Sequence, residues 1–144
     1  MITQLSAAEL GKKLASKELS AVEVAKAHLD EIAARDAAYG CFLKTDPEWT
    51  LAQAAKAQEF LDRGEGGPLT GVPIALKDNI STQGVETTCA SKILKGYVPP
   101  YDAHVVSALK QAGLPILGKT NLDEFAMGTS TETSAYRQTH NPWD

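Results

Sequence analysis

The stretch Gly71-Val72-Pro73-Ile74-Ala75-Leu76-Lys77-Asp78-Asn79-Ile80 decides the fold class. It begins with an apolar run from Val72 to Leu76, which is too short for a helix and predicts a buried strand. A second short apolar run, Pro115-Ile116-Leu117-Gly118, follows later in the chain. Between the two runs, the segment from Asp102 to Gly113 has the apolar spacing of a helix. Strand, helix and strand in that order predict a βαβ unit in a largely parallel sheet.

The part of the chain before this stretch, residues 1–63, has the pattern of several helices. Capping boxes, in which a serine and a glutamate three residues later satisfy helix-start amides, stand at Ser6-Ala7-Ala8-Glu9 and Ser20-Ala21-Val22-Glu23. Asp46-Pro47 begins a third helix, and Cys41-Phe42-Leu43 before it predicts a short strand. Apolar residues at helical spacing predict a core-facing stripe on the second helix: Val22, Ala25, Leu29 and Ile32.

These patterns predict an α/β protein in which a mainly helical segment, residues 1–63, precedes the strand-helix-strand segment, residues 64–144. The loop Gly64-Glu65-Gly66-Gly67-Pro68 joins the two segments and is short for a linker between domains, so we expect a single domain. The stripe on the second helix needs an apolar partner. We expect it to pack against the strand that carries Lys77.

Composition excludes several classes of protein. The 144 residues carry 14 Lys and Arg against 18 Asp and Glu, a formal net charge of −4, whereas a dedicated nucleic-acid binder is usually basic. No apolar run approaches the roughly 20 residues that span a bilayer, and the N-terminus lacks the basic and apolar regions of a signal peptide. Two distant cysteines, Cys41 and Cys89, make no disulfide framework. We expect a cytoplasmic protein with free thiols and no membrane contact.

Lys77 is the main candidate for chemistry. A lysine at the carboxyl end of a buried strand lies where α/β folds place their sites. Burial disfavours the ammonium form, so such a lysine could accept a proton. The alternative is a lysine whose stem packs on the sheet while its head reaches water or pairs with Asp78. From composition alone, this second interpretation is favoured.

Other candidate residues have simpler explanations. Cys89 has no histidine near it in sequence, which predicts an inert thiol. The histidines lack the spacing of metal ligands, so we expect no metal site: His28, His104 and His140. Asp123-Glu124 would point in different directions on a helix and are explained as a helix start. The hydroxyl-rich segment 128–135 offers donors to a polar ligand, but a surface loop has the same composition.

Several segments together resemble the amidase signature family. The segment 71–80 is similar to the lysine motif of that family. Later segments are similar to one branch of it, the glutaminase subunits of tRNA-dependent amidotransferases: residues 87–94, 97–103, 118–128, 130–132 and 141–144. The resemblance covers essentially the whole chain and is dense from Gly71 onward.

The resemblance implies a mixed, largely parallel sheet flanked by helices, in a domain much larger than this chain. It implies amide hydrolysis by a Ser–cis-Ser–Lys triad, in which Lys77 is the catalytic lysine and deprotonates the bridging serine. Backbone amides of a Gly/Ser-rich loop would hold the oxyanion. The hydroxyl-rich loop lines the amide pocket in this family, so Gly128, Thr129 and Ser130 are implied substrate contacts.

The resemblance also implies partners in a heterotrimeric amidotransferase. In this branch the substrate is glutamine, and the released ammonia passes to a B-subunit. That partner uses ATP and Mg to activate the glutamate misloaded on tRNA(Gln), so tRNA is reached through the B-subunit. A small C-subunit braces the pair. The chain itself would hold no cofactor and no metal.

The sequence departs from the family pattern in a small way at Tyr136-Arg137-Gln138, which concerns only the local loop conformation, and in a large way at the catalytic serines. Both catalytic serines of the family lie in a Gly/Ser-rich segment just beyond Asn141-Pro142-Trp143-Asp144, and the 144 residues contain no such segment. We therefore expect an inactive N-terminal fragment. Two other interpretations stay open: the N-terminal part of a stand-alone amidase acting on small amides, and a non-catalytic module that binds a partner.

Overall fold

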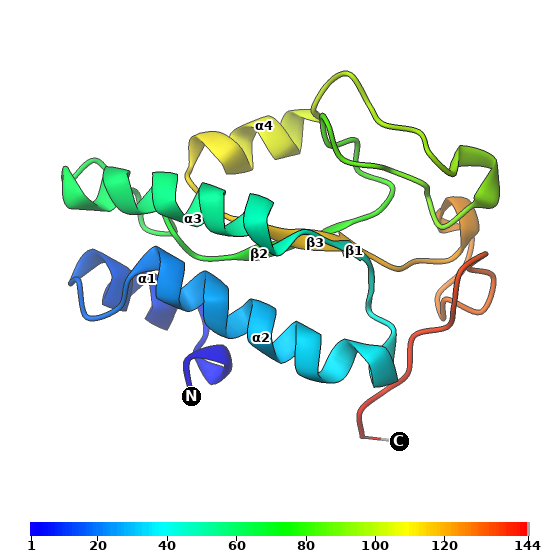
Figure 1. The fold of residues 1–144 in the computed structure, drawn as a ribbon, viewed down its shortest axis with the longest axis horizontal. Helices are drawn as coiled ribbons and strands as arrows, with labels where there is room; N and C mark the ends of the chain where they lie inside the picture. Colours follow the sequence, from blue (N-terminus) through cyan, green and yellow to red (C-terminus); the bar gives the residue numbers. More distant parts are fainter. Residues whose placement is uncertain (144) are drawn as a thin grey trace. The chain divides into compact units, whose positions relative to one another are not determined.

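A computed structural model of the chain describes residues 1–143 (Figure 1). Helices and strands follow one another along the chain in the order η1 (Ile2–Gln4), α1 (Ala7–Ala15), α2 (Ala21–Tyr39), β1 (Phe42–Thr45), α3 (Pro47–Asp62), β2 (Ile74–Lys77), η2 (Lys92–Leu94), α4 (His104–Gln111), β3 (Ile116–Thr120) and η3 (Glu124–Ala126), where η marks a 3₁₀ helix. The predicted α/β class is confirmed. None of the helices in the described residues is both long enough and apolar enough to cross a membrane.

The three strands form one mixed sheet in the order β1-β3-β2 (Figure 1). Two backbone hydrogen bonds, from Ile74 N to Pro115 O and from Asp78 N to Thr120 O, advance in the same direction on both strands, so β2 and β3 run parallel. With α4 between them in sequence, they form the βαβ unit that the sequence predicts.

Strand β1 pairs antiparallel with β3. Thr45 stands opposite Gly118, and the register is irregular between Phe42 and Lys44. A Cβ atom at Gly118 would lie 2.3 Å from the backbone oxygen of Lys44, so the close approach of these two strands requires glycine. The strand expected at residues 41–43 therefore exists, but it lies slightly later in the chain.

The chain divides into two compact units, each of which draws on residues from both sides of residue 64. The first unit contains residues 1–34, 46–74 and 108–117. Its core is formed by α1, α2, α3 and one residue just before β2: Leu10, Leu14, Ala21, Val24, Ala25, Ala54, Ala57, Leu61 and Val72. Thr50 of α3 donates a hydrogen bond to the backbone oxygen of Ile116 in β3, at 2.7 Å. The N-terminal helices thus share a core with the segment that leads into β2.

The buried face of α2 differs in part from the predicted stripe. Ala25 and Leu29 are buried as predicted, but Val22 is 38% exposed and Val24 is fully buried in its place. Residues three or four positions apart share a helix face, and the face that packs here is centred on Ala21, Val24 and Ala25. Val22 lies at its edge.

Local hydrogen bonds explain where the helices begin. Ser6 Oγ accepts from Glu9 N, and Glu9 Oε2 accepts from Ser6 N, which confirms the predicted capping box of α1. Asp46 Oδ1 accepts from Trp49 N at 3.0 Å, and Pro47 is the first residue of α3. The predicted start of the third helix is therefore confirmed.

The second unit contains residues 35–45, 75–107 and the part of the chain from Gly118 onward, described to residue 143. Much of it is loop, held by hydrogen bonds between segments that are distant in sequence. Arg137 donates to the Asp36 carboxylate, and Asn121 Nδ2 donates to Arg137 O at 2.7 Å. His140 N donates to Tyr39 O at 2.8 Å. This unit contains Lys77 and the hydroxyl-rich segment.

Candidate functional site

A cavity of about 200 Å³ in the second unit brings the lysine of β2 together with the hydroxyl-rich loop. Its lining consists of the last residue of β2 and residues after β3: Lys77, Asn121, Leu122, Asp123, Ala126, Gly128, Thr129 and Thr131. Three of the four site residues implied by the resemblance therefore meet here, namely Lys77, Gly128 and Thr129. The fourth, Ser130, lies beside the cavity, where its backbone N–H donates to Asp123 and its hydroxyl to Glu132.

Lys77 is exposed, which agrees with the interpretation favoured from composition, a lysine whose head reaches water, and not with the buried lysine of the other interpretation. Side chains alternate between the two faces of a strand. Leu76 is buried and Asp78 is only 2% exposed, whereas Lys77 between them lies on the open side. Asp78 is not paired with Lys77, because its ion-pair partner is Lys119.

The Asp123 carboxylate organises the loop that carries Gly128 and Thr129. One carboxylate oxygen accepts from the backbone N–H groups of Ser130 and Thr131, at 2.9 Å each, and the other accepts from the N–H and hydroxyl of Thr133. The bond from Thr131 contributes most, and together these donors lower the pKa of Asp123 to about 2. The carboxylate is therefore ionised at neutral pH.

Gly128 is required by this arrangement. A Cβ atom at this position would lie 2.4 Å from the carboxyl carbon of Asp123, well inside van der Waals contact. The sequence pattern explained Asp123 as a helix start, and the residue does precede η3, but its side chain makes no cap there. The loop that its carboxylate gathers lies seven to ten residues later, beyond the range of local sequence patterns.

Lys119 and Asp78 form a buried ion pair, with Lys119 Nζ 3.1 Å from Asp78 Oδ1. Their side chains are 0% and 2% exposed. Burial lowers the pKa of the Lys119 ammonium, while the Asp78 carboxylate acts in the opposite direction. Reasoning from the sequence missed this lysine; its position directly after the apolar run at Leu117 and Gly118 was the available signal.

Neither thiols nor metal ligands form a competing centre in the described residues. Burial raises the pKa of the Cys89 thiol, and the Asp78 carboxylate acts in the same direction, which keeps the sulfur protonated and weakly nucleophilic. Cys41 and Cys89 are both free thiols. Among residues 1–143, no group of three or more His, Cys, Asp or Glu side chains is placed to hold a metal ion.

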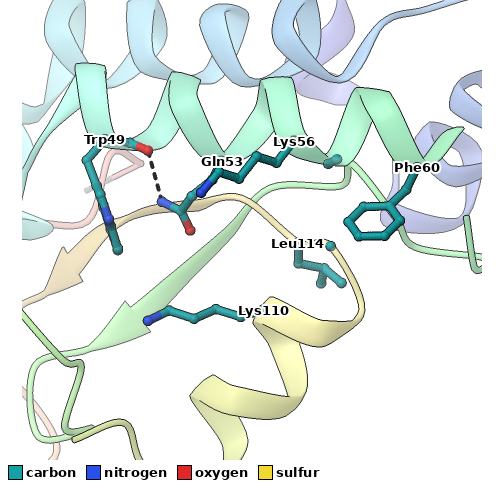
Figure 2. A pocket seen from close by; sticks show the side chains of 8 residues that line it. Trp49, Gln53, Lys56, Phe60, Lys110 and Leu114 are labelled. Atoms are coloured by element: carbon teal, nitrogen blue, oxygen red, sulfur yellow. Dashed lines mark hydrogen bonds between the residues drawn. The ribbon is translucent and has the colours of Figure 1, made fainter. Parts of the chain in front are cut away.

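A larger cavity, of about 310 Å³, lies in the first unit beside α3 (Figure 2). Four side chains of α3 and two from the region of α4 and the turn after it are labelled there: Trp49, Gln53, Lys56, Phe60, Lys110 and Leu114. Gln53 Nε2 donates to Trp49 O at 3.2 Å. The described lining includes no carboxylate, hydroxyl or thiol side chain. The cavity at Lys77 is therefore the better candidate for a catalytic centre.

The Lys77 cavity has the groups that amide chemistry uses. The cavity is lined by the Lys77 amine together with Gly128 and Thr129, and a threonine hydroxyl is a group that can hydrogen-bond a carbonyl or carboxamide. The Amidase family matches residues 23–144, which includes every residue of this cavity. The chain belongs to the amidase family. This confirms the resemblance seen in the sequence.

Named relatives of this amidase chain include tRNA-dependent amidotransferase subunits. It is 57% identical over 144 residues to the A-subunit of glutamyl-tRNA(Gln) amidotransferase from Streptomyces coelicolor, a match that covers 99% of this chain and 29% of the relative. The A-subunit from Rhodococcus erythropolis is also 57% identical, with 99% of this chain and 30% of the relative covered. The chain thus spans about 29% of the length of such curated relatives.

Solved structures share the fold of this amidase chain. A vestigial protein complex linked to the origins of an s-triazine catabolic enzyme matches with a TM-score of 0.92 and 36% identity, over 97% of this chain and 31% of that one. The A-subunit of glutamyl-tRNA(Gln) amidotransferase from Thermotoga maritima matches with a TM-score of 0.75 and 35% identity, over 100% of this chain and 28% of that one.

Proposed function

We propose that this chain provides the catalytic lysine of the glutaminase subunit of a glutamyl-tRNA(Gln) amidotransferase. The enzyme hydrolyses glutamine at this subunit, and the ammonia converts Glu-tRNA(Gln) to Gln-tRNA(Gln). The observation that carries the proposal is the cavity that joins Lys77 to Gly128 and Thr129, in a chain 57% identical to a curated A-subunit.

The proposed chemistry divides between residues in this chain and residues outside it. Lys77, in its neutral form, takes the proton of a bridging serine, which in turn activates a nucleophilic serine. Gly128 and Thr129 contact the carboxamide from the loop. The Ser130 N–H already donates a hydrogen bond to Asp123. Ser130 can therefore donate a hydrogen bond to the substrate only through its hydroxyl, which in this structure donates to Glu132. The Gly/Ser-rich segment with both serines is absent from the 144 residues, which by themselves are inactive in this proposal.

The proposal includes the partners of this branch of the family. The B-subunit receives the ammonia and uses ATP and Mg²⁺ to activate the glutamate on the tRNA, and the C-subunit braces the complex. This chain needs no cofactor of its own. We propose that the complex works in the cytoplasm, where both tRNA and ATP are present.

The test uses a chimera in which this chain replaces the matching segment of the Streptomyces coelicolor A-subunit, produced together with the B-subunit and the C-subunit. Glutamate release from glutamine is measured. We expect turnover by the chimera and a loss of about 10²–10⁴-fold in kcat on Lys77→Ala, because general acid–base catalysis contributes on that scale. The matched control is Lys92→Ala, at an exposed lysine of the same unit, which should stay within about twofold. Full activity of the Lys77→Ala chimera would contradict the proposal.

A second candidate function is hydrolysis of small amides without partner subunits. It is favoured by the TM-score of 0.86 to a 6-aminohexanoate cyclic dimer hydrolase, at 29% identity, against 0.75 for the Thermotoga maritima A-subunit. The two functions differ in substrate and in dependence on partners. The polypeptide encoded by the natural gene, assayed without the two partners, should prefer glutamine in the first case and simple amides in the second.

A further inference from the structure

The buried pair of Lys119 and Asp78 has no part in the proposed proton transfer, yet it lies next to the site. Lys119 Nζ is 3.1 Å from Asp78 Oδ1 and also donates to Ile80 O at 3.0 Å and to Thr87 Oγ1 at 2.9 Å. A buried ion pair is often no more stabilising than apolar residues of the same size, because both charges lose their hydration. We therefore expect this ion pair to have a role other than stabilising the folded state.

Asp78 is the residue after Lys77. Its backbone N–H, backbone oxygen and side-chain carboxylate all form hydrogen bonds. Its N–H donates to Thr120 O at 3.1 Å, and its backbone oxygen accepts from Cys89 N at 2.9 Å. Its Oδ2 accepts from both the N–H, at 2.9 Å, and the hydroxyl of Thr88. The backbone at the end of β2 therefore cannot shift without breaking these bonds, and this backbone sets the direction of the Lys77 side chain.

Asp78 is also linked, through the loop at residues 88–90, to the segment that supplies Gly128 and Thr129 to the cavity lining. Cys89 and Ala90 both have φ of +53°, a left-handed conformation that is unfavourable for residues other than glycine. Cys89 O accepts from Phe125 N at 3.0 Å, and Ala90 O accepts from Ala135 N at 2.9 Å. The segment 124–135, which carries Gly128 and Thr129, is thus bound to a strained loop that Asp78 fixes.

We propose that Asp78 and Lys119 are positioning residues that hold the two walls of the cavity, the end of β2 with Lys77 and the segment 124–135, in one geometry. Neither side chain is among the described lining of the cavity, so both act through the residues that they hold. The kinetic part of this inference rests on the proposed function of Lys77. Its structural part does not.

The structural test removes both charges at similar volume with Asp78→Asn combined with Lys119→Met, which avoids leaving one charge buried alone. The matched control is Asp30→Asn with Lys26→Met, which removes an ion pair whose side chains are both 65% exposed. Amide hydrogen exchange is followed in the polypeptide encoded by the natural gene. We expect at least about tenfold faster exchange at the Cys89 amide and across 124–135, with α1 and α3 unchanged. An exchange pattern like that of the control would overturn the inference.

The kinetic test is a double-mutant cycle in the chimera, with enzyme in excess so that slow variants remain measurable. Misplacing a catalytic group by about 1 Å costs on the order of 10²-fold in rate. Removing the pair should lower kcat at least about tenfold when Lys77 is present and less than about twofold in the Lys77→Ala background. Equal losses in both backgrounds would show a general effect on folding and overturn the positioning role. An unaltered rate for Lys77→Ala alone would instead refute the proposed function, and the exchange experiment would still decide the structural inference.

Discussion

The hydroxyl of Thr50 offers a direct test of how α3 is tied to the sheet. The side chain is fully buried, and its Oγ1 donates to Ile116 O at 2.7 Å and lies 3.0 Å from Asp46 O. Thr50→Val keeps the shape of the side chain and removes the donor. Ile116 O then loses this partner in a buried setting, and an unsatisfied buried polar group costs about 1–3 kcal/mol.

The added methyl group of valine offsets part of this cost, since one buried methylene contributes about 0.8 kcal/mol. Taken together, these figures give a cost of about 0.2–2.2 kcal/mol, so we expect Thr50→Val to lower the free energy of unfolding by about 1 kcal/mol. The chain is 29% of the length of a curated relative, so the unfolding entropy of the natural polypeptide is large and the accompanying fall in Tm is on the order of 1 °C. The measurement is urea and thermal unfolding of the natural polypeptide, followed by circular dichroism.

The control is Thr45→Val, the same chemical change at an exposed position of β1. Surface substitutions of this kind usually change stability by less than about 0.5 kcal/mol. Thr50→Val with the unfolding free energy of wild type, or with a loss no larger than that of Thr45→Val, would refute the view that this hydrogen bond ties α3 to β3.

Further outcomes follow from single residues. The pKa of Asp123, about 2, lies below its ordinary value of 3.8, so its carboxylate stabilises the fold above pH 3.8, and this contribution is lost as the pH falls toward 2. Asp123→Asn should flatten the pH dependence of the urea midpoint in that window, and an unchanged slope would count against it. Gly118→Ala should speed amide exchange in β1, because the new Cβ meets Lys44 O at 2.3 Å, whereas Gly67→Ala, where the nearest atom is Thr70 Oγ1 at 3.8 Å, should leave β1 unchanged. The 144-residue chain alone should release no measurable glutamate from glutamine, since loss of the nucleophile in a comparable hydrolase lowers kcat by about six orders of magnitude; turnover within about a hundredfold of the chimera would contradict this. Titration of the denatured chain without reductant should find two free thiols, from Cys41 and Cys89.

Residues whose partners are close in sequence could be interpreted from the sequence alone. The capping box at Ser6 and Glu9 and the helix start at Asp46 each depend on contacts within four positions, and both were predicted correctly. The apolar run before Lys77 identified β2, and the run at Ile116 identified β3, because a short apolar run between turn signals has few alternatives. The position of Lys77 at a strand end followed from the same pattern.

The tertiary structure decided which residues meet. The pairing of Asp78 with Lys119 depends on the register of β2 against β3, and a shift of one residue would turn Lys119 to the other face. The hydrogen bonds from residues 130–133 to the Asp123 carboxylate depend on the conformation of the loop between them. A loop conformation leaves no periodic pattern in the sequence. Burial likewise depends on which residues pack nearby: the sequence left open whether Lys77 is buried and did not single out Lys119, whereas the packing of the sheet exposes Lys77 and buries Lys119. Local patterns report contacts within one helical turn or one strand, whereas these contacts join residues seven to forty-one positions apart.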